Sequence, residues 1–357
     1  MNRRSKVLIV GPSWVGDMVM AHSLYRFLRQ RTPSIEIHVL APTWSLPLLK
    51  RMPEVAAAHE LPLGHGEIGL GIRRAVAAKL KLERFDRAIV LPRSLKAALV
   101  PFFAGIPVRT GFRGEWRYGL INDMRRFDGA RLDQTVLRFL ALGLDRNDDA
   151  PPERPPEPTL AVNEGARAAV LERLGLESTA VALMPGAEYG EAKRWPVERF
   201  ADLAVRLGAA GHPVWVLGSA KERALGEALV SAAGAERVRN LCGETTLTEA
   251  VDLLATARVA VSNDSGLMHV AAAVGTHVVA IYGSSSPLFT PPLTPKKTIL
   301  YAGLSCSPCF ARECPLHHLN CLRDIDVNAV HSATLAALSS AAVEPPPVST
   351  TSGAGKP

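Results

Sequence analysis

Short apolar runs alternate with stretches of helical periodicity along most of the chain. The apolar runs, rich in valine, isoleucine and leucine, cover residues 7–10, 35–40, 88–91, 181–184, 214–217, 259–261 and 278–282. Apolar positions recur at helical spacing in residues 18–31, 197–209, 248–255 and 327–342. Short continuous runs are typical of strands buried on both faces of a parallel sheet, with the helices as crossovers. The pattern predicts an α/β fold with parallel sheets and helices on both faces.

The alternation stops once, at residues 145–158, where the sequence is polar and rich in proline. Such a stiff polar segment cannot join a core and is typical of an interdomain linker. We therefore expect two similar α/β domains, residues 1–150 and 151–325.

The end of the chain contains one more helical pattern. Asp326 is a candidate cap for this helix, expected at residues 326–343, which we predict to pack back on the first domain. Residues 344–357 have too few apolar side chains to offset their ordering entropy, and this predicts a disordered tail.

Size and charge narrow the class of protein. At 357 residues with 47% hydrophobic side chains, the chain can build two cores. It contains no apolar run of about 18 residues and no signal-peptide pattern, so we expect a cytoplasmic protein. A net charge of +7 favours a polyanionic partner, which leaves nucleic acid, anionic lipid and a phosphorylated substrate open.

Four of the five cysteines lie close together in the sequence, at Cys306, Cys309, Cys314 and Cys321. Their thiolates are candidate ligands for zinc or an iron–sulfur cluster, although the spacing lacks a second regular pair. An odd number of cysteines also fits a reducing compartment. We favour a reduced structural loop without a bound metal.

Residues 259–269 combine a short apolar strand, several small polar residues and the start of a helix. Ser262, Asn263, Asp264 and Ser265 are all helix-capping residue types. Gly266 lets the backbone approach a ligand closely, so free amide groups can face a phosphate. Asp264 would repel a phosphate, and we expect it to bond to backbone amides or to hydroxyl groups of a ligand that carries sugar. An ordinary capped turn is the alternative interpretation.

The loop at residues 11–17 follows the first predicted strand and ends in Gly16 and Asp17. Open α/β sheets place their sites at the carboxyl ends of strands. Asp17 is a candidate general base, because a carboxylate in a cleft can take a proton from an attacking hydroxyl. The alternative is a simple helix cap.

The loop at residues 184–196 takes the equivalent place in the second half. Lys193 and Arg194 stand just before a predicted helix, where two cations suit a diphosphate leaving group. A solvated basic pair is the alternative.

Two further segments match weaker patterns. Residues 64–69 have the spacing of a dinucleotide-binding glycine motif, but no good strand precedes them, and we reject that function. Residues 109–118 mix arginines with aromatic residues that can bind nucleic acid or another phosphorylated molecule. With Arg93, Lys96, Arg125 and Arg126, they predict a cationic face on the first domain. A merely solvated loop is the alternative.

Three motifs together resemble a known family. Residues 11–18, 192–196 and 263–269 resemble the ADP-heptose:lipopolysaccharide heptosyltransferases. The first loop and the cysteine-bearing residues 306–315 look most like the branch that adds the second inner-core heptose. The resemblance spans nearly the whole chain.

The resemblance implies a GT-B architecture, in which two Rossmann-like domains face each other across a cleft. The first would bind the acceptor and the second the nucleotide sugar. Asp17 and Lys193 would be catalytic, as base and as diphosphate contact. The donor-binding candidates are Gly186, Lys193, Arg194, Glu222, Asp264, Ser265, Gly266, Leu267 and His269. The acceptor-binding candidates are Trp14, Gly16, Arg93, Lys96, Arg113 and Arg117.

The resemblance also implies the reaction. The enzyme would move L-glycero-D-manno-heptose from ADP-L-glycero-D-manno-heptose to the first heptose of heptosyl-Kdo-lipid A, the lipopolysaccharide inner-core acceptor, with inversion. No metal or cofactor would be required. The protein would contact the cytoplasmic face of the inner membrane peripherally and would not bind nucleic acid. The alternatives are transfer to another inner-core position, a GT-B sugar-nucleotide epimerase, and a non-catalytic polyanion or membrane-surface binder.

Overall fold

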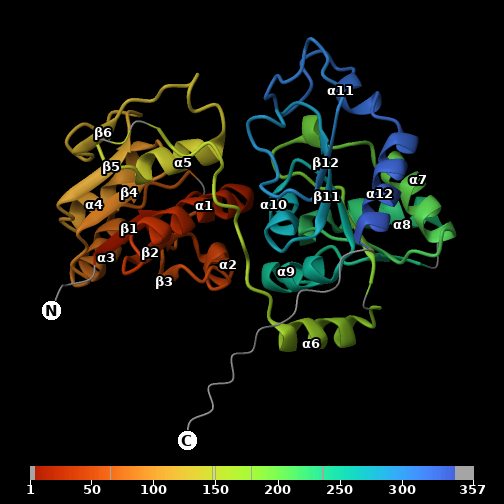
Figure 1. The fold of residues 1–357 in the computed structure, drawn as a ribbon, viewed down its shortest axis with the longest axis horizontal. Coiled ribbons are helices and arrows are strands. Elements are labelled where there is room, and N and C mark those ends of the chain that lie inside the picture. The colour runs from red at the N-terminus through yellow and green to blue at the C-terminus, as the bar shows by residue number, and fades with distance from the viewer. Residues whose placement is uncertain are drawn as a thin grey trace, which may run out of the picture.

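Two α/β lobes lie side by side in the computed structural model (Figure 1). The structure describes residues 5–64, 66–146, 148, 150–177, 179–234 and 237–341. Each lobe is built on a six-stranded sheet, and the pairings between the strands of each sheet are parallel. This confirms the predicted α/β class. The expected disordered tail lies outside the described residues.

The first sheet has the strand order β3-β2-β1-β4-β5-β6. Its strands are β1 (Lys6–Val10), β2 (Glu36–Ala41), β3 (Val55–Glu60), β4 (Arg87–Val90), β5 (Val108–Phe112) and β6 (Asp123–Arg125). The second sheet has the order β12-β11-β10-β7-β8-β9. Its strands are β7 (Val181–Met184), β8 (Val214–Val216), β9 (Val238–Asn240), β10 (Val259–Asn263), β11 (His277–Tyr282) and β12 (Lys297–Tyr301). Counted from its own first strand, each lobe therefore has the same topology.

Each sheet reverses its strand order at one place, between β1 and β4 in the first lobe and between β7 and β10 in the second. Loops that follow the two strands at such a switch point diverge to opposite faces of the sheet and leave a crevice where ligands bind. The topology therefore marks four loops as candidate site elements, those after β1, β4, β7 and β10.

Helices cover the sheets and connect the strands. The first lobe contains α1 (Val15–Arg31), α2 (Leu46–Leu49), α3 (Leu70–Lys81), α4 (Leu99–Phe103) and α5 (Thr135–Gly143). The second contains α6 (Glu164–Leu174), α7 (Val197–Ala209), α8 (Arg223–Ala233), α9 (Leu247–Thr256), α10 (Gly266–Ala273), α11 (Asn320–Arg323) and α12 (Val327–Ala341). Short 3-10 turns lie at Thr43–Ser45, Leu95–Ala98, Glu191–Lys193 and Ala220–Glu222.

One apolar core continues from the first lobe into the second. Along β1, Val7 and Ile9 join one buried cluster while Leu8 joins another on the opposite face, as the two-residue period of a strand requires. The cluster that holds Ile9 also includes Met184 of β7 and Met268 of α10. Helix α1 of the first lobe packs against α10 of the second. The two lobes are thus joined by apolar packing as well as by the connecting chain.

Polar contacts also hold the connecting chain between the lobes. Arg51, after α2, donates a hydrogen bond of 2.6 Å to the fully buried carboxylate of Asp252 in α9. The backbone amide of Asn163 donates to the other oxygen of Asp252 at 2.9 Å. The amide of Thr159 donates to Nδ1 of His22 in α1. These contacts fix where the chain enters the second lobe.

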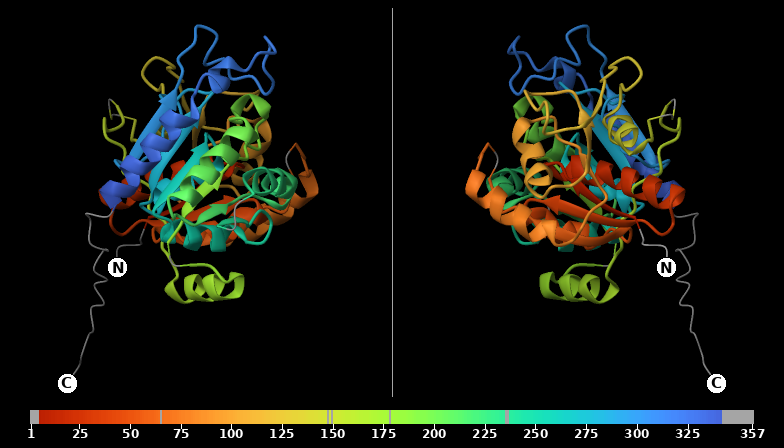
Figure 2. Two further views of the ribbon diagram at one scale, coloured as in Figure 1. Left: turned by 90° about the vertical axis from the view of Figure 1, so that its right-hand side faces the viewer. Right: turned by 90° about the vertical axis from the view of Figure 1, so that its left-hand side faces the viewer.

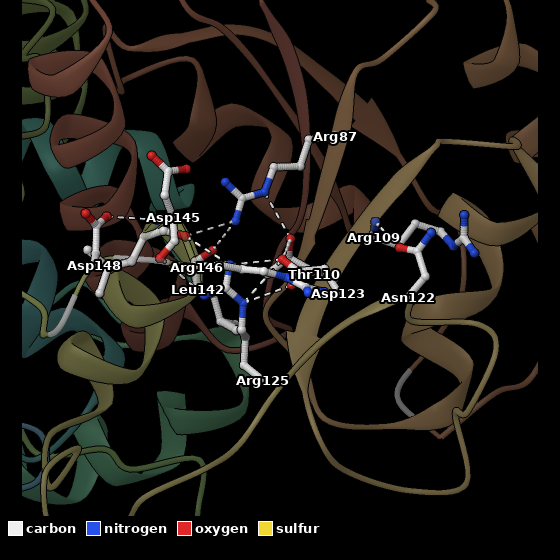
Figure 3. Close-up of polar contacts among 11 residues, drawn as sticks. Arg87, Arg109, Thr110, Asn122, Asp123, Arg125, Leu142, Asp145, Arg146 and Asp148 are labelled. Atoms are coloured by element: carbon white, nitrogen blue, oxygen red, sulfur yellow. Dashed lines mark hydrogen bonds and ion pairs between the residues drawn. The ribbon is translucent and has the colours of Figure 1, made fainter.

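A second polar network closes the far edge of the first sheet (Figure 3). Asp123 of β6 accepts hydrogen bonds from Thr110 of β5, from Arg125 and from Arg146. Arg87 of β4 donates to Thr110 and to the carbonyl oxygen of Leu142 at the end of α5. Arg125 therefore pairs with a carboxylate and is a weak contributor to the cationic face that the sequence predicts.

The structure adds strands that the apolar pattern did not reveal. β3, β5, β6, β9 and β12 lie toward the outside of the sheets and are short or only partly buried, so they need fewer apolar residues. Helix α1 begins at Val15, three residues before the predicted start, and Trp14 occupies its cap position. Asp17 is therefore inside the first turn and is not the helix cap.

The last helix does not pack on the first lobe, so that prediction is wrong. Helix α12 packs against α7, β10 and β11 of the second lobe (Figure 2). Its Val330 and Leu338 belong to the second lobe's core cluster. The chain is anchored there before the helix starts, because Trp195 and Arg199 both donate hydrogen bonds to the carbonyl oxygen of Ile325. The backbone amide of Asn328 donates to the Asp326 carboxylate, as expected for a cap.

Candidate functional site

A cavity of about 1340 Å³ opens between the two lobes at the carboxyl ends of both sheets. The loops after β1, β4, β7 and β10, the four loops at the switch points, all contribute to its wall. This volume is ample for a nucleotide sugar, since pockets for drug-sized ligands commonly measure about 300–1,000 Å³. We refer to it as the interlobe cavity.

Asp17 lines the interlobe cavity from the first turn of α1. Burial raises the pKa of its carboxyl group to about 6, while the charge of Lys193 lowers the pKa and that of Asp264 raises it. Both charged neighbours come from the second lobe. A carboxylate with a pKa near neutrality, held in a cleft, is well suited to act as a general base.

Lys193 and Asp264 form an ion pair in the cavity wall. The ammonium Nζ of Lys193 lies 2.5 Å from Oδ2 of Asp264, and both side chains are largely buried. The hydroxyl of Thr290 donates to the other carboxylate oxygen at 3.5 Å. We expected Asp264 to bond to backbone amides or ligand hydroxyls; within the protein, Lys193 balances its charge, and a bond to ligand hydroxyls stays a prediction. Because an ammonium group has three donors, Lys193 can still contact an anionic ligand.

The loops after β7 and β10 are joined by the amide group of Asn263, at the end of β10. Its Nδ2 donates to the carbonyl oxygen of Pro185, and its Oδ1 accepts from the backbone amide of Trp195. Ser265 caps α10 by accepting from the amide of Met268. Of the four capping-type residues at positions 262–265, Ser265 is the one that caps α10. The Asn263 amide holds the loop of Lys193 beside that of Asp264.

Gly16 and Gly266 allow the first turns of α1 and α10 to approach each other. A methyl group added at Gly16 would lie 2.7 Å from Cδ2 of His269, and one at Gly266 would lie 2.7 Å from Cβ of Val15. His269 is buried, and burial lowers its pKa to about 4, so the ring is neutral. Both glycines thus serve contact between the lobes, and the close approach of a ligand stays a prediction.

Replacing Gly16 with alanine is expected to lower kcat/KM by about 10-fold to 100-fold, because the methyl group would push the lobes apart and misplace Asp17. Steady-state kinetics measure this effect. Gly71→Ala in α3 is the matched control, since a methyl group there meets no atom within 4 Å. Wild-type turnover in Gly16→Ala would show that the contact with His269 does not set the geometry of the site.

The first lobe supplies aromatic and cationic side chains to the cavity. Trp14, Arg93 and Lys96, three of the acceptor-binding candidates, line it. Arg138 of α5 also lines it, which the sequence analysis missed. The guanidinium carbons of Arg93 and Arg138 each lie 4.8 Å from the ring centroid of Phe127. Two cations held by one ring give the first-lobe side of the cavity a positive character.

Several predicted site residues do not line the cavity. Arg117 is fully buried and donates to the carbonyl oxygens of Phe112 and Pro92, and burial lowers its pKa to about 10. Its assignment to acceptor binding is wrong, because its donors stabilise the loop after β5. Arg194 donates twice to the carbonyl oxygen of Ala187 in its own loop, so it braces that loop. The other predicted residues outside the cavity wall are Arg113, Leu267, Gly186 and Glu222.

Gly186 and Glu222 lie against each other next to the wall. A methyl group at Gly186 would clash with the Glu222 carboxylate at 1.5 Å. Oε2 of Glu222 accepts from the backbone amide and the hydroxyl of Ser219. Ser219 and Lys221 line the cavity directly, so Glu222 supports a segment of the wall.

The cysteine-bearing segment supports the loop of Lys193. Its three thiols, Cys306, Cys309 and Cys314, are free, as are those of Cys321 and Cys242. The carbonyl oxygen of Arg312 accepts from the amide of Ala192, and that of Phe310 accepts from the hydroxyl of Tyr189. Within the described part of the chain, no group of three or more His, Cys, Asp or Glu residues is arranged to hold a metal ion. None of the described helices is long and apolar enough to cross a membrane.

The chain is similar to a family of known proteins, to individual members of it and to a solved structure. Residues 73–320 match the model of glycosyltransferase family 9 (heptosyltransferase). The chain is 48% identical over 304 residues to lipopolysaccharide heptosyltransferase 2 of Escherichia coli K12, covering 83% of this chain and 87% of that protein. It is 46% identical over 309 residues to lipooligosaccharide heptosyltransferase 2 of Haemophilus influenzae, covering 82% and 88%. The solved structure of E. coli ADP-heptose lps heptosyltransferase II matches with a TM-score of 0.84 and 42% identity, covering 94% of this chain and 99% of that one.

Proposed function

The chain belongs to glycosyltransferase family 9, the heptosyltransferases, and from this premise we propose that it is the heptosyltransferase that adds the second inner-core heptose. The donor is ADP-L-glycero-D-manno-heptose, and the acceptor is the first heptose of heptosyl-Kdo-lipid A. The heptosyltransferase 2 proteins of E. coli and H. influenzae support this choice, because each aligns with more than four fifths of the chain. The reaction is a single displacement with inversion at the anomeric carbon.

The observation that carries the proposal is the meeting of three charged groups from both lobes in one cavity. Asp17 comes from the first lobe, and Lys193 and Asp264 come from the second. An enzyme that joins a sugar nucleotide to a second substrate needs a base on the acceptor side and a cation on the leaving-group side. Their convergence between the lobes satisfies this need.

The chemical step then follows from the positions of these groups. Asp17 accepts the proton of an acceptor hydroxyl, and the oxygen attacks the anomeric carbon of the donor. The bond between that carbon and the β-phosphate oxygen breaks, and ADP leaves with the electron pair. Lys193 stabilises the charge that develops on the diphosphate, an electrostatic role that requires no metal or other cofactor.

The decisive experiment compares acceptors. Incubation with ADP-heptose and inner-core acceptors bearing no heptose or one heptose is expected to give product only with the second, detected by mass spectrometry. Transfer to the heptose-free acceptor would assign the chain to another inner-core position. A changed sugar nucleotide without any acceptor would indicate an epimerase, and the absence of any product would leave only a binding function.

We further propose that the protein contacts the cytoplasmic face of the inner membrane peripherally, where a lipid-linked acceptor lies. The support is the loop after β5. Trp116 and Tyr118 are 86% and 56% exposed there, beside the exposed Arg113. Glu115 fastens the loop to the Arg93–Lys96 segment, because its Oε2 accepts from the amide of Leu95. Aromatic side chains beside cations suit an anionic lipid surface.

Nucleic acid is the less favoured partner for this loop. Arg109 donates hydrogen bonds from its guanidinium group to the carbonyl oxygens of Ile106 and Leu120. Figure 3 shows Arg109 next to Asn122. Arg117 is buried. Two of the arginines that suggested binding to nucleic-acid phosphates, Arg109 and Arg117, therefore donate to carbonyl oxygens of the first lobe instead.

Trp116→Ala is expected to weaken binding to vesicles of phosphatidylethanolamine and phosphatidylglycerol by roughly tenfold, because an interfacial indole group buries considerable apolar area. Cosedimentation measures the effect. Leu82→Ala is the matched control, since Leu82 is 82% exposed at the end of α3 and lies outside this loop. Equal loss in both variants, or tighter binding of a single-stranded oligonucleotide than of vesicles, would contradict the proposal.

A further inference from the structure

Ser285 carries a buried hydroxyl group that forms no hydrogen bond within the described part of the chain. Its side chain is 2% exposed, and its Oγ has no partner there. Buried polar groups in folded proteins are almost always paired, so an unpaired hydroxyl calls for an explanation. Ser285 also lines the interlobe cavity. An unpaired donor at the wall of a cavity is a candidate ligand contact.

The position of Ser285 places this hydroxyl on the donor side. It follows β11, the strand next to β10 in the second sheet. The amide of Asp264, after β10, donates to the carbonyl oxygen of Ile281 in β11. The amide of Ser284 donates to the carbonyl oxygen of Ala192, the residue before Lys193. The loop of Ser285 is therefore attached to both loops that form the Lys193–Asp264 ion pair.

The backbone around Ser285 is held from a third side as well. The amide of Phe310 donates to the carbonyl oxygen of Ser284 at 2.7 Å, and the hydroxyl of Ser307 donates to that of Gly283. Two segments distant in sequence, at Ala192 and at residues 307–310, thus fix the two residues that precede Ser285. A hydroxyl held in this way contacts a ligand without a large loss of conformational entropy.

We propose that the Ser285 hydroxyl donates a hydrogen bond to a phosphate oxygen of the donor's diphosphate, next to Lys193. The inference rests on the proposed function, which supplies a nucleoside diphosphate sugar as the ligand. Ser285 is then a binding residue of the donor site that neither its sequence motif nor its charge would reveal. In the unliganded protein, an unpaired buried hydroxyl costs free energy. A hydrogen bond from this hydroxyl to the diphosphate offsets that cost.

Ser285→Ala provides the test. Calorimetry with ADP is expected to show a roughly 10-fold to 100-fold higher Kd, as for the loss of a hydrogen bond to a charged group. The thermal midpoint should stay unchanged or rise, because the variant removes an unpaired buried hydroxyl. Adenosine, which has no phosphate, should bind equally to both proteins.

Ser284→Ala is the matched control. Ser284 is 1% exposed and its hydroxyl is also unpaired within the described residues, but it does not line the cavity. Its alanine variant should keep the wild-type Kd for ADP. An unchanged Kd in Ser285→Ala, an equal increase in both variants, or a loss confined to ADP-heptose would overturn the assignment to the diphosphate. Failure of the wild-type protein to bind ADP would instead contradict the proposed function itself.

Discussion

Replacing Asp17 with asparagine is expected to lower the rate of heptose transfer by about 100-fold to 10,000-fold, the usual contribution of a positioned general base. The amide cannot accept the proton of the acceptor hydroxyl, yet it has nearly the same shape as the carboxylate. The variant should therefore fold and bind ADP at least as tightly as the wild type, because a negative charge near the diphosphate is lost. Single-turnover kinetics and calorimetry measure the two effects separately.

The pH dependence tests the same assignment. Burial raises the pKa of Asp17 to about 6, so the carboxyl group is protonated below that pH and cannot act as a base. Transfer should rise as the pH increases through about 6 and then level off. This rise is the acidic limb of the pH–rate profile. Asp264→Asn should move it to lower pH, since the charge of Asp264 raises the pKa of Asp17. Asp17→Asn should lack the limb.

Asp202→Asn serves as the control for the substitution itself. Asp202 pairs with Arg206 on the surface of α7 and is remote from the cavity wall. Nearly normal turnover in Asp17→Asn, or a limb that persists in that variant, would remove Asp17 from the mechanism.

Replacing Lys193 with alanine is expected to lower the transfer rate by about 100-fold to 1,000-fold, because a preorganised charge next to the leaving diphosphate is lost. ADP binding should weaken as well, since ADP presents the same diphosphate. The acidic limb should move to higher pH, because the charge of Lys193 lowers the pKa of Asp17. Calorimetry with ADP and the pH–rate profile measure these changes.

A double variant separates binding from folding. Lys193→Ala leaves the buried carboxylate of Asp264 without its cation, which destabilises the fold. Lys193→Met combined with Asp264→Asn removes both charges and should recover thermal stability without recovering ADP affinity. Lys50→Ala, an exposed lysine of the first lobe, is the surface control. An unchanged Kd for ADP in Lys193→Ala would reassign the lysine to a purely structural role.

Much of the fold could be predicted because the central strands are buried on both faces. β1 and β7 are continuous apolar runs, and the pattern identified both. β6 and β9 contain only three residues each, and such short strands leave no periodic signal. The last helix was predicted in place and length, but its packing partner was not. Its contact surface depends on which lobe holds Ile325, and no local pattern contains that information.

In the candidate site, too, some residues could be identified from the sequence and others could not. Asp17, Lys193 and Asp264 could be identified from their places after strands and before helices, since these are local features. Arg117 and Arg138 could not be told apart by residue type. One is buried with its donors on backbone carbonyls, and the other lies in the cavity wall. An arginine's role is set by the segments folded around it.

The sequence by itself determined the parallel α/β class, the two repeated halves and the loops that carry charged groups, because these depend on periodicity and on neighbours a few residues apart. Only the tertiary structure decided that Lys193 pairs with Asp264, that α1 and α10 meet through Gly16 and Gly266, and that Ser285 faces the cavity. The physical reason is distance along the chain. These contacts join segments from different strands and lobes, and their geometry is fixed only when both sheets have formed and packed together.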